Sequence, residues 1–114
     1  MSLELENRFE NFAMIVRDFC RKVKWDIINV QYIQQLIRSS GSVGANYIEA
    51  SDDLGKADEK MKIKISRREV KESIHWLKLI LTYNNQPLEL EKIKLLDEAG
   101  QIQRILSTII KRLG

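Results

Sequence analysis

Residues 35–50 read QLIRSSGSVGANYIEA, and the middle of this stretch consists almost entirely of small side chains. Its two glycines, Gly41 and Gly44, each cost a helix about 1 kcal/mol relative to alanine. A helical spacing nevertheless continues through it, at Val30, Ile33, Ile37, Ser40, Gly44 and Tyr47. A flexible Ser/Gly linker would lack such a stripe. We therefore predict a helix whose small residues let a second helix approach at short range. These small residues are Ser39, Ser40, Gly41, Ser42 and Gly44.

Three further segments show helical periodicity. Residues 3–23 carry a heptad line, and a third helix is expected to begin after Gly55, with Asp58 in its first turn. The heptad line of the first segment is Leu5, Phe9, Phe12, Val16, Phe19 and Val23. The third segment has Ile63, Val70, Ile74, Leu77 and Leu81 along one line, with Ser66, Ser73, Trp76 and Ile80 beside it.

Turn signals separate these segments. Asp26 or Asn29 is expected to cap the second helix, which should end near residues 50–53. The sequence NNQP at residues 84–87 predicts a turn into a fourth helix, whose core line is Leu95, Ala99, Ile102, Leu106, Ile109 and Leu113. No segment alternates with the period of a strand. The prediction is an all-α, up-down-up-down antiparallel four-helix bundle, with residues 1–114 forming a single domain.

The composition suits a water-soluble domain. The chain has 114 residues, of which 44% are hydrophobic and 31% charged, and no apolar run approaches the roughly 20 residues of a membrane span. Its acidic start does not resemble a signal peptide, so we expect a cytoplasmic protein that does not enter a membrane. The only cysteine, Cys20, lies among apolar residues and is expected to be a buried thiol.

No pattern in the sequence indicates catalysis. His75 is the only histidine and has no partner at metal-ligand spacing, so we expect no metal and no cofactor. Glu69 and Glu72 are three residues apart, as an ordinary ion-paired surface would have them. Gly41 and Gly44 follow a helical pattern rather than a strand, which disfavours a phosphate-binding loop. We therefore expect a protein that is not an enzyme.

Cations concentrate in residues 56–71. Lys60, Lys64, Arg67 (or Arg68) and Lys71 recur every three or four residues and would form one stripe on a helix. Such a stripe is either a solvated face or a phosphate-binding surface, and the net charge of +3 permits the second. Arg67 also interrupts the apolar line, so its charge must reach solvent, a carboxylate or a neighbouring subunit. Further candidate phosphate contacts on the fourth helix are Lys92, Lys94, Arg104, Lys111 and Arg112.

The segments QLIRSSGSVGANYIEA and KIKISRREVKESIHWLKLI resemble the bacterial four-helix bundle proteins encoded in 23S rRNA intervening sequences. That family includes the accessory variability determinants of diversity-generating retroelements. The residues that carry the resemblance include Arg38, Ser42, Asn46, Glu49, Glu69, Glu72 and Trp76, and Gly44 lies within the same block. The resemblance implies a homopentameric ring with a basic surface. It also implies nucleic acid, above all RNA, and a reverse transcriptase as possible partners.

Together these observations predict a homo-oligomeric bundle that binds structured RNA or RNA–DNA as an accessory factor. The alternative is a protein–protein adaptor, for example of a reverse transcriptase, without affinity for nucleic acid. A second apolar edge on the fourth helix, at Leu96, Ile105 and Ile110, favours association in either case. In the antiparallel hairpin we expect Arg38 to pair with Glu69 or Glu72, and Asn46 to form a hydrogen bond across or along it.

Overall fold

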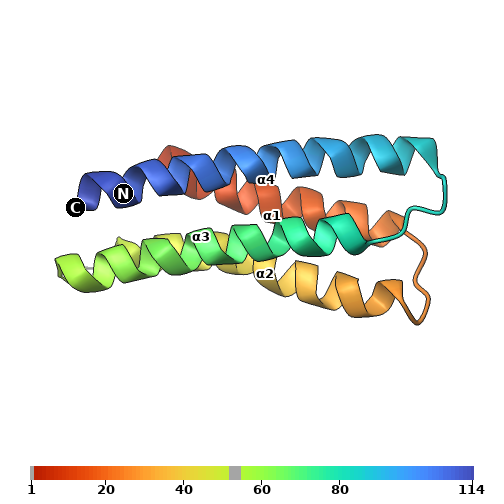
Figure 1. Cartoon of the computed structure of the whole chain (residues 1–114), viewed down its shortest axis with the longest axis horizontal. Coiled ribbons are helices and arrows are strands. Elements are labelled where there is room, and N and C mark those ends of the chain that lie inside the picture. The colour runs from red at the N-terminus through yellow and green to blue at the C-terminus, as the bar shows by residue number, and fades with distance from the viewer. Residues whose placement is uncertain (1, 52–54) are drawn as a thin grey trace.

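The computed structural model describes residues 2–51 and 55–114, and these residues form four antiparallel helices (Figure 1). The helices are α1 (Leu3–Lys22), α2 (Asn29–Ala50), α3 (Lys56–Leu79) and α4 (Gln86–Leu113). Each helix packs against the next in sequence, and α1 also packs against α4, which closes the bundle. The molecule measures 46 × 22 × 19 Å. The predicted up-down-up-down bundle is therefore confirmed.

Side-chain caps begin the first two helices. Ser2 Oγ accepts a hydrogen bond of 3.1 Å from the Leu5 amide at the start of α1. Before α2, Asp26 Oδ1 accepts from the amides of Ile28 at 3.1 Å and Asn29 at 2.8 Å. Of the two caps predicted for α2, Asp26 is thus the one that satisfies the free amide groups.

Backbone geometry explains the two later turns. Gly55 precedes α3 with φ of 91°, a left-handed conformation that glycine adopts without steric penalty. Tyr83 and Asn84 are also left-handed, with φ of 53° and 62°. Asn85 Oδ1 then accepts from the Leu88 amide at 3.1 Å, and Pro87 lies in the first turn of α4. The predicted turn at residues 84–87 is confirmed, and it begins one residue earlier, at Tyr83.

The core largely follows the predicted lines, but Ile37 of α2 and Leu81 are exposed. The heptad residues of α1 from Phe9 onward are buried, as are Leu95, Ala99, Ile102 and Leu106 of α4. In α3 the prediction for Leu81 is wrong, because the helix ends at Leu79 and the backbone becomes extended at Ile80. Ile80 therefore enters the core in place of Leu81, which is exposed.

The two glycines of α2 have different environments. Gly44 is buried, and a Cβ atom at this position would lie 3.4 Å from Phe9 Cβ of α1. Gly41 is exposed, and a Cβ atom there would have no neighbour within 4 Å. Ser39 and Ser40 are buried as predicted, whereas Ser42 donates to a carbonyl of its own helix. The expected close approach therefore holds for Gly44 and is wrong for Gly41, which the helix rotation turns toward the surface.

Buried hydroxyl groups join α2 to α3. Ser39 Oγ and Ser73 Oγ are 2.8 Å apart, and both residues are fully buried. Ser66 Oγ donates to the Val43 carbonyl oxygen at 2.6 Å. Because small hydroxyl side chains occupy these positions, the two helices can approach closely while every buried polar atom keeps a partner.

An ion-pair cluster lies at the edge of the same hairpin. Arg38 Nη1 donates to Glu69 at 3.0 Å, and Arg38 Nη2 pairs with Glu72, so the predicted pairing is confirmed with both carboxylates. The indole of Trp76 lies 3.4 Å from Glu72. Asn46 donates to a carbonyl oxygen one turn earlier at 2.8 Å, which confirms a hydrogen bond along the hairpin. Nearby, Glu49 pairs with Lys62.

None of these helices, within the part of the chain that is described, is long and apolar enough to cross a membrane.

Candidate nucleic-acid interface

The predicted basic stripe lies along the N-terminal half of α3. Lys64 and Lys71 are exposed, while Lys60 and Arg67 are half-buried. The same spacing continues to Lys78, seven residues after Lys71, which is also exposed and which our sequence analysis missed. A search for the period beyond residue 71 would have found it. We call Lys60, Lys64, Arg67, Lys71 and Lys78 the basic face.

Arg67 connects the basic face to α4. Its Nη1 atom donates to Ser107 Oγ at 3.3 Å, across the boundary between α3 and α4. The Arg67 charge is thus kept out of the apolar core, because the guanidinium points toward α4 and remains half-exposed. Arg104, one turn before Ser107 on α4, is exposed next to Gly100. Arg67 and Arg104 therefore extend the positive charge from α3 onto α4.

Two of the predicted site residues have other contacts. Lys92 Nζ donates to the Ile80 carbonyl at 2.9 Å and to the Lys78 carbonyl at 3.3 Å, so it satisfies carbonyl groups at the end of α3. Arg68 lies 3.7 Å from the carboxylate of Glu69, which also pairs with Arg38 of α2. The structure thus separates Lys92 and Arg68 from the basic face.

Carboxylates are distributed unevenly around the bundle. On the other faces, acidic side chains pair with Arg8, Lys22, Arg38 and Lys62 at short distances. Among the described residues, no ion pair includes a member of the basic face or Arg104. The cations of this face therefore keep their charge available for an external anion.

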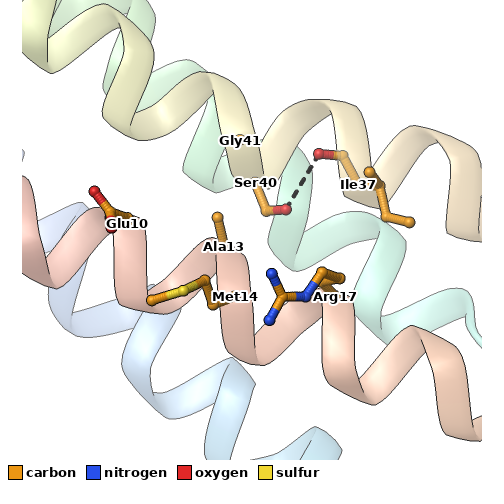
Figure 2. A pocket seen from close by; sticks show the side chains of 7 residues that line it. All are labelled: Glu10, Ala13, Met14, Arg17, Ile37, Ser40 and Gly41. Carbon is orange, nitrogen blue, oxygen red and sulfur yellow. Dashed lines mark hydrogen bonds between the residues drawn. The ribbon is translucent and has the colours of Figure 1, made fainter.

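A groove between α1 and α2 is lined mainly by apolar side chains, with Glu10 and Arg17 at its edge. Figure 2 shows one part of it, where Ala13 and Met14 of α1 face Ile37, Ser40 and Gly41 of α2. Ser40 Oγ donates to the carbonyl oxygen of Ile37 at 3.3 Å, so the floor is largely non-polar. A second hollow continues the groove past Gly44 to Ile48. Met14, Ile37 and Ile48 are exposed apolar side chains along its length.

Across residues 2–51 and 55–114, no three His, Cys, Asp or Glu side chains are placed to hold an ion. Glu69 and Glu72, which share one face, are both bound to Arg38.

Comparison with known proteins identifies the family. The family model described as "23S rRNA-intervening sequence protein" matches residues 2–108. The chain belongs to this family. The fold is also that of a crystal structure of a protein of unknown function from the S23 ribosomal protein family of Bacteroides thetaiotaomicron. That structure is 24% identical and superposes with a TM-score of 0.78 over 93% of this chain and 97% of the other. No curated protein matches the chain.

Proposed function

We propose that this member of the 23S rRNA-intervening sequence protein family is a non-enzymatic, homo-oligomeric accessory factor that binds structured RNA or RNA–DNA. The observation that carries the proposal is the basic face, whose cations have no carboxylate partner among the described residues, whereas Arg8, Lys22, Arg38 and Lys62 on other faces are paired. Lys60 to Lys78 spans about 27 Å along a helix axis, which lets several cations meet successive phosphates. Family membership adds a connection with ribosomal RNA.

Oligomerisation would multiply a modest affinity per subunit. The α1–α2 groove offers exposed apolar side chains. On α4 the predicted apolar edge is half-buried, with Leu96 and Ile110 packed on the core, and the exposed apolar residues are instead Leu90 and Ile93. A ring would repeat the basic face once per subunit, and linked weak contacts bind more tightly than one alone. Light scattering should therefore give several times the mass of one chain. Gly41→Leu should lower that mass by filling the groove without disturbing the monomer, and an unchanged mass would exclude the groove as the subunit contact.

The phosphate contact is tested with two matched variants. Lys64→Gln/Lys71→Gln removes two unpaired charges, whereas Lys22→Gln/Lys62→Gln removes the same charge from lysines held in ion pairs on other faces. Binding to a labelled RNA hairpin is followed by fluorescence anisotropy over a range of salt concentrations. The first variant should weaken binding and reduce the slope of log K against log salt by about 1.4–1.8, and the second should leave the slope near that of the parent. Equal slopes for both variants and the parent would refute the proposal.

The alternative function, an adaptor that binds another protein, has one observation in its favour. The α1–α2 groove has small residues on its floor and exposed apolar side chains beside Glu10 and Arg17, a combination that suits an amphipathic helix. If the parent shows no salt-dependent binding to RNA while the groove variant loses a protein partner such as a reverse transcriptase, the adaptor function replaces the first proposal.

A further inference from the structure

Two loops meet at the end of the bundle opposite the chain termini. The α1–α2 loop and the α3–α4 loop lie at the same end, seen on the right of Figure 1. Asn29, which is fully buried, joins them: its Nδ2 donates to the carbonyls of Lys24 and Leu81 at 2.9 Å each. Its Oδ1 accepts from the Leu81 amide at 2.9 Å. The side chains that these loops display are therefore held in fixed positions relative to one another.

This end is unusually rich in exposed aromatic and aliphatic side chains. Trp25 is 60% exposed, Tyr83 49% and Ile27 83%. Tyrosine and tryptophan bury large surfaces where they are used for packing, so two of them left in solvent on tied loops indicate a binding surface. The basic face reaches this end of the bundle, because Lys78 lies one residue before the end of α3.

The polar groups of both rings are already used inside the protein. Trp25 Nε1 donates to the Cys20 carbonyl at 2.8 Å, and the Tyr83 hydroxyl donates to Asp26. At protein–protein interfaces these groups are commonly available to the partner. Here neither ring has a free donor hydrogen, so each offers a ligand mainly its face and C–H edges, which suits stacking.

Tyr83 is held in place against its own backbone preference. A bulky side chain at φ of 53° is a conformational outlier, and the next residue is left-handed as well. The bond to Asp26 and the ammonium of Lys24, 5.3 Å from the ring centroid, restrain its orientation. Lys24 also supplies an exposed positive charge beside the ring.

We propose that this end, comprising Trp25, Tyr83 and Lys24, is a stacking platform for unpaired nucleobases. The rings would stack on bases irrespective of their identity, and Lys24 would contact the adjoining phosphate. The inference rests on the proposed nucleic-acid function and adds that the ligand carries single-stranded nucleotides, such as a loop or an end, in addition to the part held by the basic face. Two aromatic rings beside a cation fit this ligand better than a protein partner, which commonly forms hydrogen bonds with ring polar groups that are used internally here.

The experiment uses the intrinsic fluorescence of Trp25. The chain has two tryptophans, so a Trp76→Phe background leaves Trp25 as the only one. This protein is titrated with an unstructured single-stranded RNA, an abasic oligonucleotide of the same length and a blunt duplex. Trp25→Ala and Trp25→Phe, made in the parent chain, are compared by anisotropy, and their melting curves confirm that each variant is folded.

Single-stranded RNA should quench Trp25, and the abasic oligonucleotide should bind without quenching. Trp25→Ala should weaken single-stranded binding by about 5- to 150-fold, the usual effect of losing one stacked base, and leave duplex binding unchanged. Trp25→Phe should retain most of the affinity, because phenylalanine still offers a ring face.

The outcomes separate this inference from the proposed function. If single-stranded RNA and the abasic oligonucleotide bind equally and Trp25→Ala changes neither, the platform is refuted while phosphate binding stands. If single-stranded RNA quenches Trp25 but Lys64→Gln/Lys71→Gln binds as the parent does, the basic face is refuted and the platform stands. If no oligonucleotide binds, both are refuted and this end is left for a protein partner.

Discussion

Replacing Gly44 with leucine should destabilise the bundle where α1 approaches α2. A Cβ atom alone would lie 3.4 Å from Phe9 Cβ, an ordinary contact, so Gly44→Ala should be neutral or stabilising by up to about 1 kcal/mol through helix propensity. Leucine adds three further carbon atoms against Phe9, which is fully buried and packs edge-to-face on Tyr47 at 4.9 Å. Phe9 has little room to move, so overpacking should cost about 1–3 kcal/mol.

Thermal denaturation followed by circular dichroism measures this effect. For a domain of this size, 1 kcal/mol corresponds to a shift of about 4 °C in Tm. Gly41→Leu is the matched control, because a side chain there meets no atom within 4 Å of its Cβ and gains helix propensity. Its Tm should equal or exceed that of the parent, measured at a dilution where light scattering gives the same oligomeric state. A Gly44→Leu melt equal to that of the parent, or an equal fall for both variants, would show that Gly44 does not mark a close approach.

Three further predictions concern the polar contacts and the buried thiol. Arg38→Met should lower the free energy of unfolding in urea by about 1–3 kcal/mol, because Glu69 is only 5% exposed and loses its strongest partner. Adding Glu69→Gln should recover part of the loss, and a free energy of unfolding that Arg38→Met leaves unchanged would contradict this prediction. Asn29→Ala should lower the free energy of unfolding by about 2–5 kcal/mol, because it leaves three backbone groups of the two loops unpaired. A loss below 0.5 kcal/mol, about the effect of an ordinary surface change, would mean that water replaces the Asn29 side chain. Burial raises the pKa of Cys20 to about 12, so iodoacetamide at pH 8 should label it rapidly only in denaturant; rapid labelling of the folded protein would show that α1 detaches.

Residues that obey a helical period were predictable from the sequence. The pairing of Arg38 with Glu69 and Glu72 was predicted because an antiparallel hairpin fixes which residues lie at the same level. Gly41 was placed wrongly because small residues carry no sign of which face they occupy when several adjoin. Leu81 was placed wrongly because a period does not indicate where the helix ends.

The two loops were the least predictable part. Asn29 was considered as a helix cap, and its role in joining residues far apart in the chain depends on the packed structure. Nothing in the sequence shows that Tyr83 adopts a left-handed conformation, since a tyrosine rarely does. In the sequence Lys92 looks like the cations of the basic face. Only the position of the end of α3 shows that Lys92 binds carbonyl groups there.

The hydroxyl groups between α2 and α3 also restrict how these helices can be aligned. An interface made only of aliphatic side chains could slip by one turn, about 5.4 Å, and bury a similar apolar area. In this hairpin such a slip would separate Ser39 from Ser73 and Ser66 from the Val43 carbonyl, leaving buried polar groups unsatisfied on both helices. The serines thereby select a single register for the hairpin, and with it the position of every cation on α3 relative to α4.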